Sequence, residues 1–365
     1  MRLLVVSTPV GALGSGRGGG VEVTLQTIVA GMLARGHRVT VLAGEGSSLP
    51  DGCAGASLLT VAGADQPSWQ HRDREAPIEM PAGGLLARLW EQALARGDAF
   101  DLILNLAYDW LPFWLTRWCA PPLCHLVSMG SLATAMDEVI EAVARWCPDR
   151  LAFHTAAQAA DFRLPVPPRL VGNGFALDRY RFVAQPEPVL GWAGRITPEK
   201  GLEDAVAVAV LLGMPLRVWG VRQNGAYAAA VEASAPEGTI EWRGFLPTGA
   251  FQAQLGRCAV FLNTPKWNEA FGNVVVEAMA CGVPVAAYAR GGPGELVCEG
   301  HNGALSPPDD IEALAAAALR ARALDRAGCR RWAERHHSAE AFSGRIESWL
   351  EEVRRGAGGP PRCQP

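Results

Sequence analysis

The sequence lacks any long run of charges of one sign. Its 33 basic and 37 acidic residues are mixed along 365 positions and leave a formal net charge of −4. A surface that binds a polyanion needs basic residues gathered on one face or in one stretch. We therefore expect no nucleic-acid partner.

Paired cysteines are missing as well. The nine cysteines are scattered, odd in number and never spaced as C-x-x-C, which argues against both a disulfide framework and a zinc knuckle. No spacing of His, Cys and Asp indicates a metal site. We expect neither a metal nor another cofactor.

Long apolar runs are absent too, since none reaches the roughly 20 residues that a membrane-spanning helix needs. The apolar run at 3–6 is too short for the core of a signal peptide and breaks at 7–9, where the sequence is Ser-Thr-Pro. This run is better interpreted as a first buried strand. We expect a cytoplasmic protein without a transmembrane segment.

Strands and helices alternate along the chain. After the strand at 3–6 and a glycine-rich turn, apolar residues recur at helical spacing up to Gly36, and a second strand follows at 39–43. This βαβ unit places the glycine loop at the carboxyl end of a parallel sheet, where open α/β sheets bind ligands. Prolines cluster at 165–168 and 186–188, and a strand at 189–193 then starts a second alternation.

The expected fold is α/β, with two doubly wound Rossmann-like domains that face each other across a cleft. The first domain is expected at 1–185 and the second at 186–338. A helix at 339–355 is expected to pack back on the first domain, and residues 356–365 read as a disordered tail.

The glycine loop at 14–20 has five glycines in seven positions, with a G-x-G-x-x-G match at Gly14, Gly16 and Gly19. Together with Glu45 near the end of the second strand, this pattern is compatible with a nicotinamide-dependent dehydrogenase. That fingerprint has its first glycine directly after the strand, however, whereas residues 8–13 intervene here. The loop fits an anion or a sugar at a helix N-terminus at least as well.

The segment 261–284 predicts a strand end, a loop that carries Glu269 and a helix that begins near Gly272. Backbone N–H groups at the helix start can bind a diphosphate without any side chain. Glu269 and Glu277 lie one in the loop and one in the helix, so they are not placed as a hydrolase pair that flanks one glycosidic bond. One carboxylate can orient a transferred sugar and the other a nucleoside. The alternative is that Glu277 only caps or pairs on its helix.

The run from Glu269 to Glu277 resembles the E-x7-E motif of the family 4 retaining glycosyltransferases, which have the two-Rossmann GT-B fold. The resemblance continues over 278–285 (AMACGVPV), 291–297 (GGPGELV) and 300–303 (GHNG). Upstream, 194–201 (GRITPEKG) resembles the segment with the family's phosphate-binding arginine and lysine, and 18–22 (GGGVE) resembles its N-terminal glycine loop. The resemblance spans nearly the whole chain, and it implies a retaining hexosyltransferase that uses a UDP-sugar.

Roles for individual residues follow from these observations. Arg195 and Lys200 come after a strand end and would offset the negative charge of a departing nucleoside diphosphate. The resemblance implies that His125 contacts the transferred sugar. The expected catalytic residues are Arg195, Lys200, Glu269 and His125. The expected donor-binding residues are Gly18, Gly19, Gly20, Phe271, Gly272, Asn273 and Glu277. No residue is an obvious nucleophile, which is consistent with the front-face retention that the resemblance implies, in which the leaving phosphate takes the acceptor's proton. Catalysis would then be mostly positioning and electrostatics.

A narrower resemblance is to the cyanobacterial UDP-glucose:tetrahydrobiopterin glucosyltransferases. It rests on the segments 10–22, 105–112, 125–131 and 265–267 and on Ala270. It implies UDP-glucose as donor and a pterin as acceptor, which could stack on Trp110 while Asp109 accepts hydrogen bonds from ring N–H groups. Core packing explains most aromatic residues of 108–114 equally well. The role of His154 stays open.

Other functions compete with this interpretation. A dehydrogenase would leave Arg195, Lys200 and Glu269 unexplained. A nucleotide-sugar epimerase would need acids placed for proton transfer at a sugar carbon, and a non-catalytic nucleotide-sugar sensor would differ only in its lack of turnover. Within the glycosyltransferases, another sugar or a lipid could be the acceptor.

Overall fold

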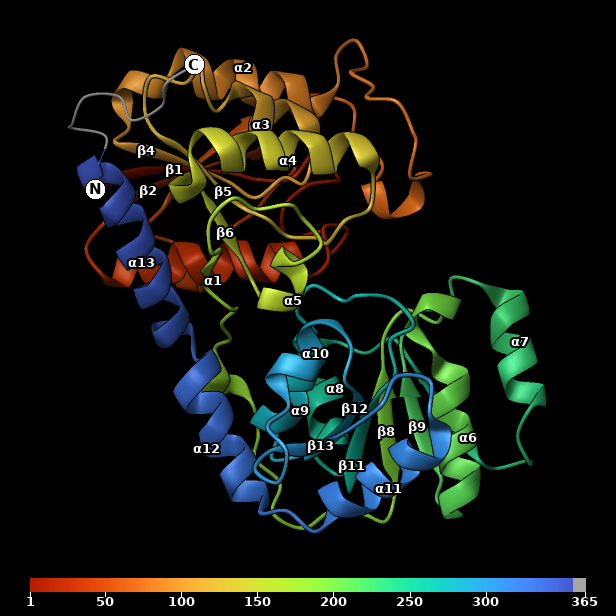
Figure 1. Cartoon of the computed structure of the whole chain (residues 1–365). Helices are drawn as coiled ribbons and strands as arrows, with labels where there is room; N and C mark the ends of the chain where they lie inside the picture. Colours follow the sequence, from red (N-terminus) through yellow and green to blue (C-terminus); the bar gives the residue numbers. More distant parts are fainter. Residues whose placement is uncertain (357–365) are drawn as a thin grey trace. The chain divides into compact units, whose positions relative to one another are not determined.

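The computed structural model describes residues 1–356 of the chain (Figure 1). The chain forms two compact units, of which the first combines Met1–Phe175 with the chain from Ala339 and the second is Ala176–Ser338. The predicted tail at 357–365 lies outside the described residues, and Gly356 is the last residue of a helix. Within residues 1–356, no helix combines the length and the apolarity needed to cross a membrane.

The first unit contains a seven-stranded parallel sheet in the order β3-β2-β1-β4-β5-β6-β7. Its strands are β1 (Arg2–Val6), β2 (Arg38–Gly44), β3 (Ser57–Val61), β4 (Leu102–Asn105), β5 (Leu123–Leu126), β6 (Leu151–Phe153) and β7 (Arg169–Leu170). Successive residues of a strand point to opposite faces. Leu3 and Val5 of β1 accordingly join one apolar core, and Leu4 and Val6 join another.

Helices cover both faces of this sheet (Figure 1). One face carries α1 (Gly20–Ala34) and α13 (Ala339–Gly356). The other carries α2 (Leu85–Ala95), α3 (Trp110–Leu115) and α4 (Thr134–Trp146), and the short α5 (Ala156–Ala159) follows β6. The last helix of the chain, α13, thus belongs to the first unit, where Phe342, Ile346 and Trp349 are completely buried in the core beside α1.

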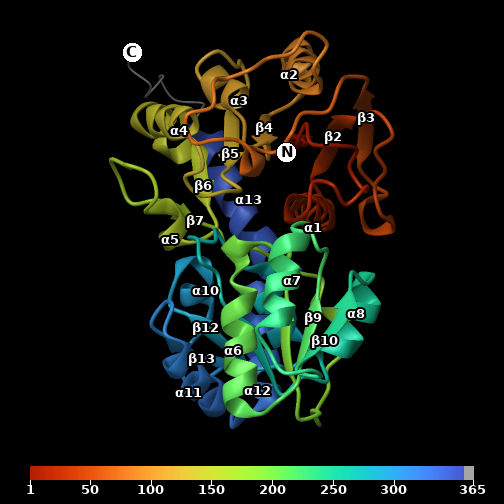
Figure 2. The same ribbon diagram turned by 90° about the vertical axis from the view of Figure 1, so that its right-hand side faces the viewer.

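The second unit contains a six-stranded parallel sheet in the order β10-β9-β8-β11-β12-β13. Its strands are β8 (Leu190–Ala193), β9 (Leu216–Trp219), β10 (Ile240–Gly244), β11 (Val260–Asn263), β12 (Val285–Tyr288) and β13 (Gly303–Ser306). Its helices are α6 (Leu202–Leu212), α7 (Gly225–Ala233), α8 (Thr248–Leu255), α9 (Asn273–Ala280), α10 (Gly291–Leu296), α11 (Ile311–Arg322) and α12 (Arg326–His337). Residues of α6, α7 and α11 share one core with the strands, while α9 and α12 pack together elsewhere. Figure 2 shows α6 and α7 side by side in front of this sheet.

The boundary between the units lies between Phe175 and Ala176 rather than between 185 and 186. Arg330 of α12 donates hydrogen bonds to the carbonyl oxygens of Leu177 and Tyr180, each at 2.7 Å. Arg326 of the same helix donates to the carbonyl of Val183 at 2.9 Å. These bonds tie the segment 177–183 to the second unit. The proline cluster that suggested the later boundary lies beyond this segment.

Candidate functional site

The strand order of the second unit reverses between β8 and β11, which pair in the middle of the sheet. From β8 the chain adds β9 and β10 on one side, and it then returns to add β11, β12 and β13 on the other. In open α/β sheets, ligands bind outside the carboxyl ends of the strands at such a switch point. The loops 194–201 and 264–272, which follow β8 and β11, therefore mark the candidate site.

Backbone and side-chain hydrogen bonds hold these two loops together. The Thr264 hydroxyl donates to the carbonyl of Gly201 at 2.7 Å and accepts from the Trp192 indole at 3.1 Å. The Lys266 N–H donates to the carbonyl of Glu199 at 2.9 Å. Gly201 has φ +65°, and a Cβ atom there would lie 2.0 Å from the Thr264 carbonyl oxygen. Only glycine lets the loops approach this closely.

The contact between the loops brings two predicted catalytic residues together. Lys200 Nζ lies 2.8 Å from Glu269 Oε1, and the two side chains are only 16% and 17% exposed. The ammonium group also lies 5.1 Å from the centre of the Trp267 ring. Because an ammonium group has three N–H donors, Lys200 keeps donors for an anionic ligand while it holds Glu269 in place. Arg195 lies in the same loop, where its guanidinium group pairs with Glu199 at 3.2 Å.

The lysines of the chain also distinguish these two loops from the rest of the sequence. Of the 33 basic residues of the chain only two are lysines, Lys200 and Lys266, and each lies in one of the two loops. All other basic side chains are arginines, so an ammonium group occurs here and not elsewhere among the side chains. This count is visible in the sequence, and it would have drawn attention to Lys266.

Lys266 anchors the loop after β11. Its ammonium group pairs with Asp204 of α6 and lies 3.1 Å from Asp309 Oδ1. Arg290 also pairs with Asp309 and donates to the carbonyl of Pro265 at 2.7 Å. The hydrogen bond from Arg290 holds the pKa of Asp309 below its usual value. Three loops are thus joined by charged groups that sequence reasoning did not assign.

The loop that carries Glu269 continues into the N-terminus of α9. The predicted diphosphate-binding residues are Phe271, Gly272 and Asn273. Asn273 is the first residue of α9, and Gly272 before it has φ +95°. A Cβ atom on Gly272 would lie 2.9 Å from Pro293 Cγ, and the Gly292 N–H donates to the carbonyl of Glu269 at 2.7 Å. The α10 segment therefore packs closely against this loop and fixes its path into the helix.

Glu277 lies one turn into α9, against Tyr180. The Tyr180 hydroxyl donates to Glu277 Oε1 at 3.1 Å. Burial of the carboxyl group raises the pKa of Glu277 to about 7, and the hydrogen bond from Tyr180 opposes that rise. This contact was not predictable from local sequence patterns, because the partners are 97 positions apart.

In the first unit, a carboxylate of the protein itself binds the N–H groups of the glycine loop. The predicted donor-binding glycines here are Gly18, Gly19 and Gly20. The Glu22 carboxylate accepts hydrogen bonds from the N–H groups of Gly14 at 2.8 Å, Gly16 at 3.2 Å and Gly18 at 2.7 Å. The Gly18 N–H is thus bonded within the protein, and binding of the donor by Gly18 stays a prediction. Oriented amides bind an anion, as expected for such a loop, but the anion is the protein's own side chain.

The His125 side chain is enclosed within the first unit, so its contact with the sugar stays a prediction. His125 lies in β5 and is completely buried. Its ring nitrogens lie 3.2 Å from Asn105 Nδ2 and 2.8 Å from Thr116 Oγ1, and its ring stacks on Phe113 with the centroids 4.3 Å apart. Burial lowers the pKa of His125 to about 3, so the ring is neutral and structural. A short motif match carried no information about burial.

The second histidine of interest is buried as well. His154 follows β6, and its Nδ1 atom lies 2.7 Å from the carbonyl oxygen of Gly172. Burial lowers the pKa of His154. Within residues 1–356, no group of three His, Cys, Asp or Glu side chains is placed to hold a metal.

The two predicted acceptor residues have different surroundings. Asp109 is buried and caps α3, because its Oδ1 accepts the Trp110 N–H at 2.8 Å. Burial raises the pKa of Asp109 to about 6. Trp110 is partly exposed and stacks on Trp114, with the ring centroids 5.8 Å apart. Asp109 is therefore occupied by a structural role, whereas Trp110 keeps an accessible ring.

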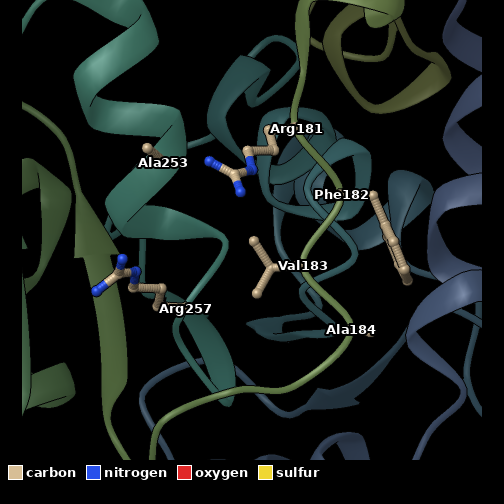
Figure 3. A pocket seen from close by; sticks show the side chains of 6 residues that line it. All are labelled: Arg181, Phe182, Val183, Ala184, Ala253 and Arg257. Atoms are coloured by element: carbon tan, nitrogen blue, oxygen red, sulfur yellow. The ribbon is translucent and has the colours of Figure 1, made fainter.

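A surface pocket of about 310 Å³ lies next to α8 in the second unit (Figure 3). Its lining residues are Arg181, Phe182, Val183, Ala184, Ala253 and Arg257. Arg257 is engaged by Glu187 at 3.4 Å. The lining contains none of the predicted site residues and no acid or nucleophile, so the pocket does not provide the chemistry of the candidate site.

Comparison with known proteins places the chain among sugar-transferring enzymes. A family model described as "Glycosyl transferases group 1" matches residues 179–338. A D-inositol 3-phosphate glycosyltransferase of Geodermatophilus obscurus is 30% identical over 91% of this chain and 84% of its own length. A 2-deoxystreptamine N-acetyl-D-glucosaminyltransferase of Streptomyces fradiae is 37% identical, but that match covers only 36% of this chain and 33% of the relative.

Solved structures share the fold at lower identity. Anabaena HepE, solved with UDP and glucose, has a TM-score of 0.73 at 19% identity and covers 96% of this chain and 100% of its own. AviGT4, a glycosyltransferase involved in avilamycin A biosynthesis, has a TM-score of 0.70 at 19% identity and covers 99% of both chains. The fold is therefore that of the GT-B glycosyltransferases, with a Rossmann-like domain in each unit.

Proposed function

Because the chain belongs to the group 1 glycosyltransferases, we propose that it transfers a sugar from a UDP-sugar to a hydroxyl group of a small acceptor. The observation that carries this proposal is the Lys200–Glu269 pair. It lies at the carboxyl ends of β8 and β11, beside the N-terminus of α9, so a cation, an acid and a helix start lie together where an anionic ligand is expected.

Each group of the site has a role in this proposal. Lys200 offsets the charge that develops on the departing diphosphate, and the first N–H groups of α9 donate to its oxygens. Glu269 accepts from a hydroxyl of the transferred sugar, and Glu277 accepts from the ribose of the nucleoside. Arg195 adds a second positive charge from the loop of Lys200.

The reaction proceeds with retention in this proposal. The bond between the anomeric carbon and the phosphate oxygen breaks, the acceptor oxygen bonds to the same face, and the acceptor proton passes to the leaving UDP. Glu269 is held by Lys200 through Oε1 and acts on the sugar hydroxyls rather than as a nucleophile. The rate then derives from positioning and from charge stabilisation.

We further propose glucose as the donor sugar and a pterin as the acceptor. Glucose as the donor sugar is supported by the resemblance to UDP-glucose-dependent enzymes and by HepE, which was solved with UDP and glucose. A pterin acceptor is supported by the same resemblance and by the accessible ring of Trp110. Cyclitols are the second candidate acceptors, because relatives of the chain are named for inositol 3-phosphate and 2-deoxystreptamine.

Selective amine labelling tests the donor site. The side-chain amines of the protein are Lys200 and Lys266 alone, so acylation followed by mass spectrometry reports on one site residue and one internal control. UDP should protect Lys200 at least fivefold, whereas Lys266, already paired with Asp204 and Asp309, should react equally with and without UDP. Unchanged labelling of Lys200 at saturating UDP would contradict the proposed site.

Turnover tests the reaction and the acceptor. UDP release from UDP-glucose is measured with tetrahydrobiopterin, with inositol 3-phosphate and with 2-deoxystreptamine. Glu269→Gln should lower kcat by about a hundredfold, in the range found when one transition-state contact is lost. The matched control is Glu241→Gln, which removes another ion-paired acid of the same unit, one that pairs with Arg217. Equal activity of the two variants would exclude Glu269 from catalysis.

A further inference from the structure

The segment just after the unit boundary is fixed to the second unit at several points. A 3-10 turn at Leu177–Arg179 leads into Tyr180. Arg330 donates to the carbonyls of Leu177 and Tyr180, and it also donates to the carbonyl of Ala280 at 2.6 Å. One guanidinium group thereby clamps this segment to the C-terminal end of α9, the helix that carries Glu277.

The Tyr180 side chain connects this segment to Glu277 of the candidate donor site. Tyr180 is buried, and its hydroxyl donates to Glu277 Oε1 at 3.1 Å. Desolvation, followed by the neighbouring carboxylate, raises the pKa of Tyr180, so the phenol stays neutral and acts as a donor. Among residues 1–356, the hydrogen bond from Tyr180 is the one that lowers the pKa of Glu277, and it occupies Oε1 rather than Oε2.

The other polar groups around Tyr180 and Glu277 do not take over the role of the phenol, which is to stabilise the ionised Glu277 carboxylate. The Gln252 side chain approaches Tyr180 from α8. The Cys281 thiol, at the end of α9, has its pKa raised to about 12 by burial and therefore stays neutral. Arg330 lies near Cys281, but its guanidinium group is engaged by three carbonyls. Tyr180 is therefore the group that stabilises the ionised form of Glu277.

We infer that Tyr180 is a positioning residue of the donor site, whose hydroxyl holds the Glu277 carboxylate with Oε2 presented to the ribose hydroxyls of the nucleotide. This inference rests on the proposed role of Glu277. A carboxylate bound through one oxygen cannot rotate freely, and a hydrogen bond to the charged form keeps it charged. Tyr180 thus does two things for the same acid, orientation and ionisation.

The test compares Tyr180→Phe with a matched control in UDP binding. The control is Tyr227→Phe, because the Tyr227 hydroxyl donates to Glu203 of α6, another carboxylate in the same unit. Calorimetric Kd values for UDP are measured from pH 5.5 to 8.5. The phosphate of UDP titrates identically with every variant, so differences between variants report on the protein.

The expected result has two parts. At pH 7, Tyr180→Phe weakens UDP binding about tenfold, whereas Tyr227→Phe changes it less than twofold. Glu277 binds ribose when ionised, so affinity is present above its pKa and falls as the pH drops below it. The wild-type midpoint lies near the pKa of about 7. Without the phenol this pKa rises, and the midpoint moves upward by about one pH unit.

Glu277→Gln separates the failure of this inference from that of the proposed site. If Glu277→Gln weakens UDP binding but Tyr180→Phe leaves both the Kd and the pH midpoint unchanged, the role of Tyr180 is refuted while the donor site stands. If Glu277→Gln binds UDP as the wild type does, the donor role of Glu277 and the inference fail together. A purely structural role for Tyr180 predicts a lower melting temperature with an unshifted midpoint, which also overturns the inference.

Discussion

Replacement of Gly201 by alanine probes how closely the two site loops must approach. Gly201 begins α6 and Gly213 ends it, and their φ angles are nearly the same, +65° and +61°. At Gly213 a Cβ atom would meet nothing within 4 Å, whereas at Gly201 it would lie 2.0 Å from the Thr264 carbonyl oxygen. Comparison of alanine variants at Gly201 and Gly213 therefore distinguishes the cost of backbone strain, which both share, from the cost of disturbing the packing between the two loops.

The two alanine variants should differ in stability by a predictable amount. A left-handed φ costs a non-glycine residue about 1 kcal/mol at either position. At Gly201 the overlap adds the cost of forced movement in a packed site, about 1–3 kcal/mol. Separation of the loops also removes the hydrogen bond from Thr264, worth about 1 kcal/mol. We expect a loss of about 1 kcal/mol for Gly213→Ala and about 3–5 kcal/mol for Gly201→Ala.

Urea unfolding measures these free energies, and UDP release measures the consequence for the site. Gly201→Ala should lower kcat/KM for the donor at least tenfold in the folded enzyme, because the shift moves Lys200 away from Glu269. Gly213→Ala should keep wild-type kinetics. Equal free-energy losses for the two variants, or wild-type turnover by Gly201→Ala, would refute the idea that the site depends on this close contact.

Three further substitutions test other features of the structure. Glu22→Ala leaves three loop amides without their acceptor and should lower the free energy of unfolding by about 2–4 kcal/mol; a loss below 1 kcal/mol in urea unfolding would show that the carboxylate is dispensable. His125→Gln should lower the melting temperature yet leave kcat within threefold, and a hundredfold loss of kcat at unchanged stability would restore the catalytic role that burial argues against. Arg330→Met should free the segment 177–180 from α9, so limited proteolysis should cleave there several times faster than in the wild type, and unchanged protection would contradict the clamp.

The fold could be predicted from the sequence because alternating strands and helices leave a local signature. The strand after Val189 and the helix stop at Gly36 depend on nearby residues, and the structure has β8 and α1 there. The proximity of Lys200 and Glu269 could be predicted for a related reason. Each follows a strand end, and parallel strands bring their ends to one edge of the sheet.

Contacts between distant positions were not predictable in the same way. His125 matched a motif, but its burial depends on Phe113 and Asn105, whose positions the motif does not encode. Tyr180 meets Glu277 across 97 positions, and Arg330, still farther along the chain, bonds the carbonyls of both Tyr180 and Ala280. The glycine loop was predicted to hold an anion or a sugar. The sequence could not reveal that the carboxylate of Glu22, inside the helix that follows, accepts hydrogen bonds from the loop's N–H groups.

The position of α13 sets an order of folding during synthesis. The second unit is one continuous stretch, Ala176–Ser338, so all of it is synthesised before the last helix. The first unit begins earlier but must wait, because Phe342, Ile346 and Trp349 fill the core beside α1. Until they emerge, that face of α1 stays uncovered. Although it starts first, the amino-terminal half of this enzyme is therefore the last to be completed.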